Sequence, residues 1–174
     1  MEPIKVLVVY DSLTGNVEAM ANSVAEGAKE AGVLVSLKRV DDVEIDDILS
    51  YDAFAFGSPT HCGTMSFKMN EFFNRRMHPR YWGKLKYKVG VAFTSSGGLG
   101  GGNETVLWSM ISVMLNFGMM TFGIPDYVSR DVTLHYGAVA IKKPDKDSLD
   151  ACKLLGKRLV EHAKVIKAGL AAGS

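Results

Sequence analysis

Hydrophobic residues fill positions 4–10 of the chain and are interrupted only by Lys5. Strands that are covered on both faces, as in a parallel sheet, carry continuous apolar runs of this kind rather than an alternating pattern. Further apolar runs follow along the chain and predict four more strands. The five predicted strands cover residues 4–10, 33–40, 53–57, 89–94 and 119–123.

Hydrophobic and small residues recur at helical spacing between these strands. Val17, Met20 and Val24 begin such a series, which Gly32 ends. Three later series predict helices, and Asn103 is placed to cap one of them. The predicted helices cover residues 17–31, 65–77, 103–117 and 147–168, with a short helix from Asp46.

Strands that alternate with helices indicate an α/β fold, a doubly wound five-stranded parallel sheet with strand order 2-1-3-4-5. We expect one domain, 1–174, because this length fits a single core. Residues 126–136 are expected to be irregular and 138–141 to return to the sheet as a short strand. The small-residue tail 169–174 is expected to be disordered.

Ligands of such sheets bind beyond the carboxyl ends of the strands, so the loops after strands 1, 3 and 4 are the candidate site. The first loop opens a helix, and its hydroxyls and free N–H groups suit a phosphate. An ordinary helix cap explains the same residues equally well. The loop consists of Ser12, Leu13, Thr14, Gly15, Asn16 and Val17, and it holds no lysine or arginine.

The other two loops are rich in proline, glycine and hydroxyl residues. The second consists of Ser58, Pro59, Thr60, His61, Cys62 and Gly63. Alone it could be a plain strand-to-helix turn. The third consists of Thr94, Ser95, Ser96, Gly97, Gly98, Leu99, Gly100, Gly101 and Gly102. Its glycines suit a backbone that lies against a flat ligand, although a flexible connector would also use them.

Other nucleotide-binding and signalling motifs are missing from these loops. After Gly98 and Gly100, a GxGxxG motif would need glycine where Asn103 stands, and a P-loop would need lysine at the same position. A phosphoacceptor aspartate at the end of strand 3 is replaced by Gly57 and Ser58.

Composition excludes several classes of protein. The net charge of +1 argues against nucleic-acid binding. Cys62 and Cys152 form neither a CxxC pair nor a zinc site, no spacing predicts a metal, and a cytoplasmic location is expected. No signal peptide is apparent. The apolar stretch 106–124 contains polar residues and glycines, so a buried helix and strand explain it better than a membrane span.

Several segments together resemble the flavodoxin-like superfamily, and most of all the WrbA-type NAD(P)H:quinone oxidoreductases. The resemblance covers about residues 4–159. It rests on Gly57-Ser58-Pro59-Thr60, Gly63-Thr64-Met65-Ser66, Tyr81-Trp82-Gly83-Lys84, residues 94–104 and Tyr136-Gly137-Ala138. The segments 73–81 and 127–144 are shorter than in WrbA, and Asn116 stands near the place of a histidine that such enzymes carry.

The resemblance implies FMN as the cofactor, NAD(P)H as electron donor, a quinone or a redox partner protein as acceptor, and a homodimer or homotetramer. The first loop would hold the flavin phosphate, residues 59–63 would flank the ring near N5, and residues 94–101 would donate N–H groups toward N1 and O2. His61 is the candidate proton donor. Tyr81 and Trp82 would either line the ring pocket or form a subunit contact.

Two alternatives to this oxidoreductase stay open. The first is a flavodoxin that only carries electrons, and the second is a structural or regulatory protein with a degraded flavin site. Electron-carrying flavodoxins are usually strongly acidic and have aromatic and acidic residues in the third loop. This chain has glycines there and a net charge of +1. The sequence therefore favours the enzyme over the carrier.

Overall fold

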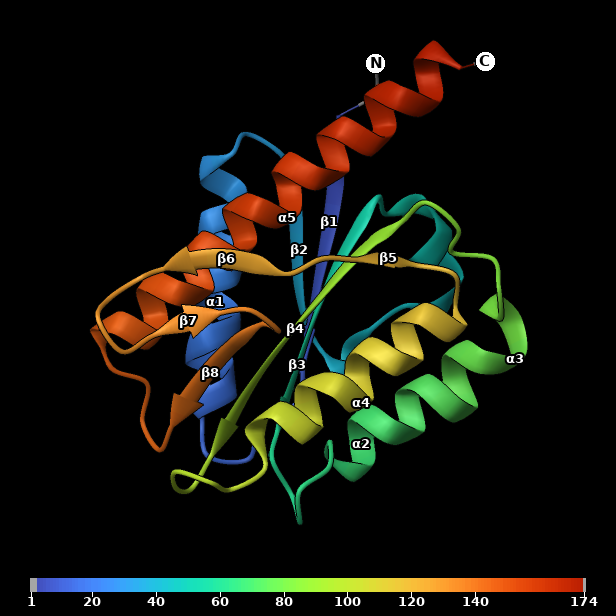
Figure 1. The fold of residues 1–174 in the computed structure, drawn as a ribbon. Coiled ribbons are helices and arrows are strands. Elements are labelled where there is room, and N and C mark those ends of the chain that lie inside the picture. Colours follow the sequence, from blue (N-terminus) through green and yellow to red (C-terminus); the bar gives the residue numbers. More distant parts are fainter. Residues whose placement is uncertain (1–2, 174) are drawn as a thin grey trace.

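A parallel sheet forms the centre of the computed structural model, which describes residues 3–173 (Figure 1). The strand order is β2-β1-β3-β4-β5, with β8 also paired to β4. The order predicted from the sequence, 2-1-3-4-5, is therefore confirmed. The sheet strands are β1 (Lys5–Tyr10), β2 (Leu34–Arg39), β3 (Ala53–Pro59), β4 (Val89–Ser96), β5 (Met120–Thr121) and β8 (Ala138–Ile141).

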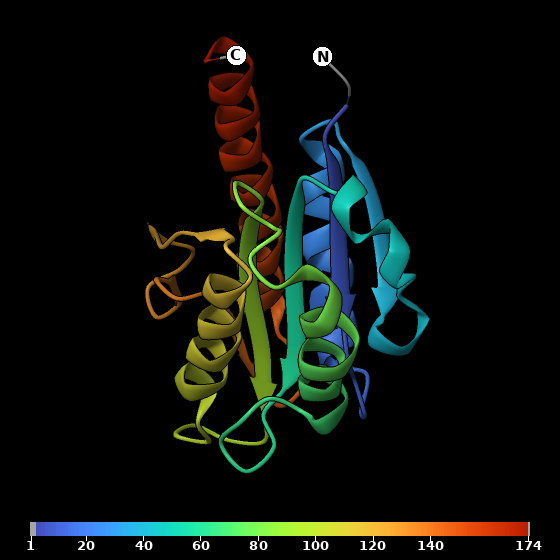
Figure 2. The same cartoon turned by 90° about the vertical axis from the view of Figure 1, so that its right-hand side faces the viewer.

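Helices cover both faces of this sheet (Figures 1 and 2). One face carries α1 (Asn16–Glu30) and α5 (Lys146–Ala172). The other carries α2 (Phe67–Glu71), a π-helical segment (Phe72–Met77), α3 (His78–Tyr81) and α4 (Asn103–Asn116). Short 3₁₀ helices cover Val40–Asp42 and Ile45–Ser50. This arrangement is a doubly wound α/β fold, as expected.

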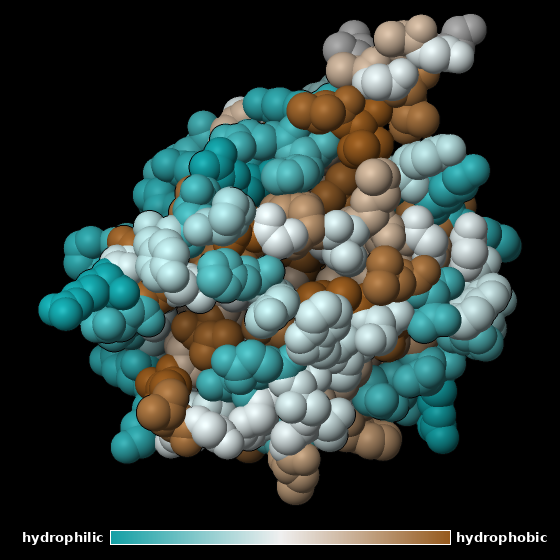
Figure 3. All heavy atoms as spheres, in the orientation of Figure 1, coloured by the Kyte–Doolittle hydropathy of each residue, from teal (hydrophilic) through white to brown (hydrophobic). Residues whose placement is uncertain are grey.

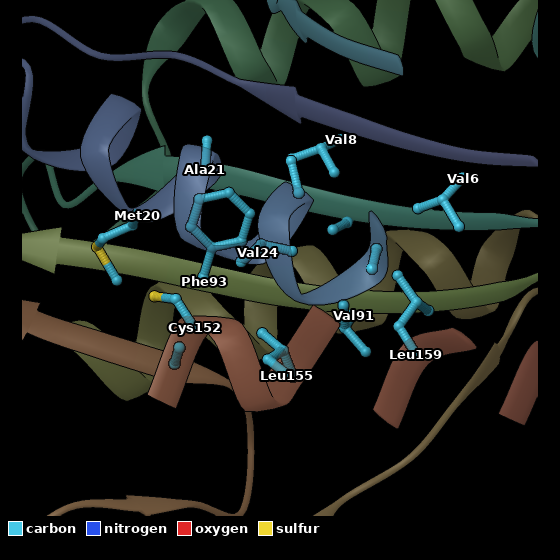
Figure 4. Close-up of a cluster of buried hydrophobic side chains, with 14 of the residues drawn as sticks. Val6, Val8, Met20, Ala21, Val24, Val91, Phe93, Cys152, Leu155 and Leu159 are labelled. Atoms are coloured by element: carbon cyan, nitrogen blue, oxygen red, sulfur yellow. The ribbon is translucent and has the colours of Figure 1, made fainter. Parts of the chain in front are cut away.

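Side chains from the two faces of β1 pack into two separate hydrophobic cores. Val6 and Val8 point to the side of α1 and α5, whereas Leu7 and Val9 point to the side of α2 and α4. Figure 4 shows Val6 and Val8 among side chains from α1, β4 and α5. Cys152 lies in this core, where burial raises the pKa of its thiol. Burial on both faces explains why the strand pattern is continuous rather than alternating.

Helices α1 and α5 cross at two glycines. A Cβ atom on Gly27 would lie 1.9 Å from the carbonyl oxygen of Lys153, and one on Gly156 would lie 2.0 Å from that of Val24. Both distances are far below any real contact, so only glycine permits this approach. Because α1 follows β1 and α5 follows β8 in the chain, the N-terminal ends of both helices lie at the carboxyl edge of the sheet, where the predicted site lies.

The fifth strand position is divided between two short strands. β5 pairs with the start of β4 through Met120, and β8 pairs with its end through residues Ala138 to Ile141. The segment between them contains an antiparallel pair, β6 (Ile124–Tyr127) and β7 (Thr133–Leu134). The return of 138–141 to the sheet is confirmed, whereas the prediction of an irregular 126–136 is wrong for these paired residues.

Several predicted boundaries need correction. β3 and β4 continue to Pro59 and Ser96, because the two strands stay paired that far. The helix predicted at 65–77 starts at Phe67, since the Ser66 side chain caps it, and its middle is π-helical. The tail 169–174, which was predicted to be disordered, is helical to Ala172. Of this tail, Ser174 alone lies outside the described residues.

None of the helices within residues 3–173 has the length and apolar character that a membrane span needs. Figure 3 shows hydrophobic residues where the C-terminal part of α5 leaves the body of the molecule. Val165 and Leu170 are the exposed large apolar residues of this part. The face in this view otherwise mixes hydrophilic and hydrophobic residues.

Candidate functional site

The three predicted loops meet at the carboxyl edge of the sheet and enclose a hollow of about 270 Å³. Their meeting follows from the strand order, because β1, β3 and β4 are adjacent and parallel. The residues that line the hollow are Ser12, Leu13, Thr14, Asn16, Val17, Pro59, Thr60, His61, Ser95, Ser96, Gly97 and Lys142. All but Lys142 belong to the loops that the sequence singled out.

The first loop ends in an uncapped helix. Gly15 has a φ of 84° and occupies the N-cap position of α1, where no side chain accepts a hydrogen bond from the first turn. The Ser12 Oγ instead accepts from the Gly15 N–H at 3.1 Å. The N–H groups of the first turn therefore stay available to an anion, at the positive end of the helix dipole. By contrast, side chains cap α2 and α5.

Arg39 at the end of β2 supports this loop from outside the hollow. Its Nη2 donates to the Ser12 carbonyl at 2.9 Å, and its guanidinium lies 5.7 Å from the centre of the Tyr10 ring. The Tyr10 hydroxyl donates to Glu18, and desolvation by burial, with this hydrogen bond, raises the Tyr10 pKa. The sequence analysis missed Arg39, because only the pairing of Tyr10 with Arg39 brings it there.

The second loop contains a tight turn from His61 to Thr64. The His61 N–H donates to the Thr64 carbonyl at 2.9 Å, and the Thr64 N–H donates to the His61 carbonyl at 3.0 Å. Both central residues, Cys62 and Gly63, have positive φ angles of 50° and 73°. This geometry is that of a type I′ turn. Pro59, Thr60 and His61 line the hollow, whereas Cys62 and Gly63 form the turn away from it.

A hydrogen-bond network fixes the second loop to the third. The hydroxyls of Thr60 and Thr94 lie 3.0 Å apart, and the Thr60 hydroxyl also lies 3.2 Å from Asn103 Oδ1. The Thr94 hydroxyl donates to the Ser58 carbonyl at 2.7 Å. Thr94 is fully buried and does not line the hollow. Its observed role is to hold the two loops in register.

The third loop approaches the second at Gly102, whose φ is 96°. A Cβ atom there would lie 2.9 Å from the Gly63 Cα, so these two glycines set the spacing of the loops. Gly102, and not Asn103 as predicted, occupies the N-cap position of α4. The Asn103 side chain instead accepts a hydrogen bond from the Thr60 hydroxyl.

Most glycines of the third loop lie outside the hollow. Of Gly97, Gly98, Gly100 and Gly101, only Gly97 lines it. Gly100 borders a neighbouring hollow of about 400 Å³ beside α4 and the β7–β8 segment. Cβ atoms on Gly97 and Gly98 would meet no atom within 4 Å, so this part of the loop faces open space.

Tyr81 and Trp82 lie away from the hollow of their own chain. Tyr81 is buried and its hydroxyl donates to the Ile45 carbonyl at 2.5 Å. Trp82 packs against His78 and Phe117, near the start of β4 and thus at the opposite edge of the sheet. Of the two alternatives that the sequence left open, lining the ring pocket is therefore wrong within one chain.

Lys142, which follows β8 directly, is the lining residue that the sequence analysis missed. Its N–H donates to the Ser96 carbonyl at 2.7 Å, and its own carbonyl accepts from Ser95 Oγ at 3.2 Å. Nothing in the local pattern marks this lysine, because its position depends on the pairing of β8 with β4. It brings a positive charge to a set of otherwise neutral donors.

Comparison with known proteins agrees with this geometry. Residues 8–104 match the flavodoxin family model. A flavodoxin of Aquifex aeolicus is 45% identical over 167 residues, which cover 95% of this chain and 90% of that protein. A NAD(P)H dehydrogenase (quinone) of Bradyrhizobium diazoefficiens is 36% identical, with 92% of this chain and 97% of that protein covered.

Solved structures show the same fold. A flavodoxin from the domain Archaea superposes with a TM-score of 0.75 and 28% identity, with 92% of this chain and 99% of that chain covered. A WrbA-like flavodoxin from Agrobacterium tumefaciens gives a TM-score of 0.74 and 25% identity, with 92% and 98% covered. The architecture, the three converging loops and these similarities lead to one conclusion: the chain belongs to the flavodoxin family.

Proposed function

We propose that this protein is an FMN-dependent oxidoreductase that passes electrons from NAD(P)H to a quinone or a similar small acceptor. FMN, when bound, would supply the hydride and electron chemistry. The protein would bind the cofactor, orient it and control access to it. Family membership implies the cofactor, and the donor set of the hollow supports it.

The first loop is the proposed holder of the flavin phosphate. Uncapped N–H groups at the start of α1 and the hydroxyls of Ser12 and Thr14 surround one end of the hollow. Hydrogen bonds from such donors to a charged acceptor are shorter and stronger than neutral ones. At about 270 Å³, the hollow is below the range of roughly 300–1,000 Å³ that encloses most of a ligand. The ribityl phosphate would therefore lie inside and the ring at the mouth.

The ring would lie between the second and third loops. Their residues toward the hollow are Pro59, Thr60, His61 and Gly97, and the exposed Leu13 adds an apolar side chain at the mouth. His61 is the imidazole among the lining residues and is our candidate for a proton donor to the reduced flavin or the acceptor. Backbone N–H groups of the third loop would stabilise negative charge on the ring.

One observation carries the choice of an enzyme over a carrier. The third loop has no aromatic or acidic side chain before Glu104, and its Gly97, Gly98 and Gly100 face open space. A nicotinamide or quinone could stack on a ring that such a loop leaves uncovered. An electron carrier instead benefits from a shielded ring and an acidic surface for partner docking.

The second candidate is a flavodoxin that carries electrons between proteins. It is favoured by the name of the 45% identical relative, which is a flavodoxin. The same hollow would hold FMN in this case, and only the electron donor and acceptor would differ.

Two measurements on the purified protein test the proposal. First, the spectrum and mass of the bound cofactor should identify FMN. Second, NADH or NADPH alone should bleach the flavin band under anaerobic conditions, and addition of benzoquinone should give sustained nucleotide oxidation. A protein that binds FMN but is reduced by neither nucleotide is a carrier. A protein that binds no flavin at all contradicts both candidates.

A further inference from the structure

The proposed phosphate site contains no cation from its own loop. Residues 12–17 include neither lysine nor arginine. A phosphate monoester carries about −1.5 to −2 charges at neutral pH, and desolvating such a charge without a counter-charge is costly. Backbone and hydroxyl donors offset only part of this cost. A cation from another part of the chain would complete the site.

Arg39 is already engaged elsewhere. Its guanidinium donates to the outer side of the loop through the Ser12 carbonyl and lies 3.9 Å from Glu18. It does not line the hollow. Arg39 therefore holds the shape of the loop, and its charge is partly balanced by Glu18.

Lys142 lines the hollow together with five residues of the first loop, Ser12, Leu13, Thr14, Asn16 and Val17. Its main chain is anchored to β4 by the two hydrogen bonds with Ser95 and Ser96. The base of the side chain is thus fixed, whereas the side chain itself is exposed. Such an anchored lysine can reach an anion with little loss of backbone freedom.

Neighbouring charges leave the Lys142 ammonium available. The Asp145 carboxylate accepts from the Ser148 N–H at 2.8 Å and caps α5, and Lys146 pairs with Asp150. Across residues 3–173 no ion pair of Lys142 is present. The side chain of this lining residue is therefore exposed and has no ion-pair partner among these residues.

The backbone of Lys142 also points to a use for its side chain. Its φ is 59°, a left-handed conformation that glycine adopts without the penalty that other residues carry. Within residues 3–173 only Cys62 and Tyr87 share this feature among non-glycine residues. Strain of this kind concentrates at functional sites and persists where the surrounding structure holds it, here through the hydrogen bonds of the Lys142 main chain with Ser96 and Ser95.

We infer that Lys142 supplies the positive charge for the flavin phosphate, a role that the first loop cannot fill. This inference rests on the proposed binding of FMN and adds a residue that determines which flavin is bound. The lysine would favour FMN over riboflavin, which has the same ring and ribityl chain without the phosphate.

The test compares FMN and riboflavin binding to apo-protein by fluorescence quenching. Lys142→Gln should weaken FMN binding about tenfold to a hundredfold, the range expected for a charged hydrogen bond, and leave riboflavin binding unchanged. Lys142→Arg should restore most of the FMN affinity. Added salt should lower the FMN affinity of the unchanged protein more than it lowers the FMN affinity of the Lys142→Gln variant. Lys143→Gln removes the adjacent exposed lysine, which does not line the hollow, and is the matched control.

Three results would overturn the inference. Unchanged FMN affinity in Lys142→Gln would remove the lysine from the site. Equal losses for FMN and riboflavin would place it at the ring or the ribityl chain instead of the phosphate. Equal losses in Lys142→Gln and Lys143→Gln would indicate a general charge effect. If the unchanged protein binds neither flavin, the proposed function itself fails, which is a different and recognisable outcome.

Discussion

Glycine serves opposite purposes at the α1–α5 crossing and in the third loop. At the crossing, Cβ atoms on Gly27 and Gly156 would lie within 2.0 Å of the partner helix backbone. In the loop, Cβ atoms on Gly97 and Gly98 would meet nothing within 4 Å. The crossing therefore needs glycine for packing, whereas these loop positions do not need it for the fold of the chain by itself.

Gly102 is intermediate in the space that it leaves for a Cβ atom, which would lie 2.9 Å from the Gly63 Cα. Its backbone is left-handed, and it lies against Gly63 of the second loop. The comparison separates glycines that permit two segments to pack from glycines that leave room for a ligand. Substitutions at the crossing should then lower stability, substitutions in the open part of the loop should lower flavin affinity, and substitution of Gly102 should lower both.

The largest effect is expected for Gly156→Ala. The added methyl group would overlap the Val24 carbonyl and force α1 and α5 apart, with a loss of about 3 kcal/mol in the free energy of unfolding. This loss should appear even though alanine favours helix by about 1 kcal/mol over glycine. Thermal or urea unfolding of the apo-protein measures it.

Gly169→Ala is the matched control in the same helix, because its added Cβ would meet no atom within 4 Å. It should stabilise the protein slightly or leave it unchanged. Similar losses in both variants would show that close packing at the crossing is not what Gly156 provides.

The next effect is expected for Gly102→Ala. The left-handed φ costs about 1–2 kcal/mol with a side chain present, and the contact with Gly63 adds to this. Stability and FMN affinity should both fall, because the spacing of the second and third loops changes. Calorimetry and FMN titration of the same preparation give the two numbers. A loss of stability alone would separate this spacing from the flavin site.

Thr14→Ala should act on binding alone. Loss of one charge-assisted hydrogen bond should weaken FMN binding about tenfold, with unfolding unchanged, because Thr14 is exposed. Thr64→Ala replaces an exposed threonine that directly follows the second loop and does not line the hollow, and it is the control in the same titration. Unchanged affinity in the double variant Ser12→Ala/Thr14→Ala would exclude the first loop from the site.

The smallest effect on stability is expected for Gly98→Ala. Its φ is not in the left-handed range and its added Cβ would face open space, so the free energy of unfolding should change by less than about 0.5 kcal/mol. Any fall in FMN affinity would then report a clash with the ring itself. If the apo-protein is destabilised as much as in Gly102→Ala, the contrast between packing and ligand-facing glycines does not hold.

The sequence by itself determined the strand order, the sites of the main helices and the three loops that meet at the carboxyl edge. These features depend on local patterns: continuous apolar runs such as 4–10, helical spacing such as that of Val17 and Met20, and glycine-rich turns. Sequence analysis accordingly predicted most of the residues that line the hollow. Lys142 and Arg39 were not, since nothing in their own segments marks them.

Only the tertiary structure decided which residues from distant segments share the hollow. Lys142 reaches it because β8 pairs with the end of β4, and Arg39 reaches the first loop because β2 pairs with β1. Thr94 and Asn103 form hydrogen bonds with Thr60, Gly102 rather than Asn103 occupies the N-cap position of α4, and Trp82 lies at the far edge of the sheet. Strand register and helix packing set these positions. Both are sums of many long-range contacts, which no local pattern of residues contains.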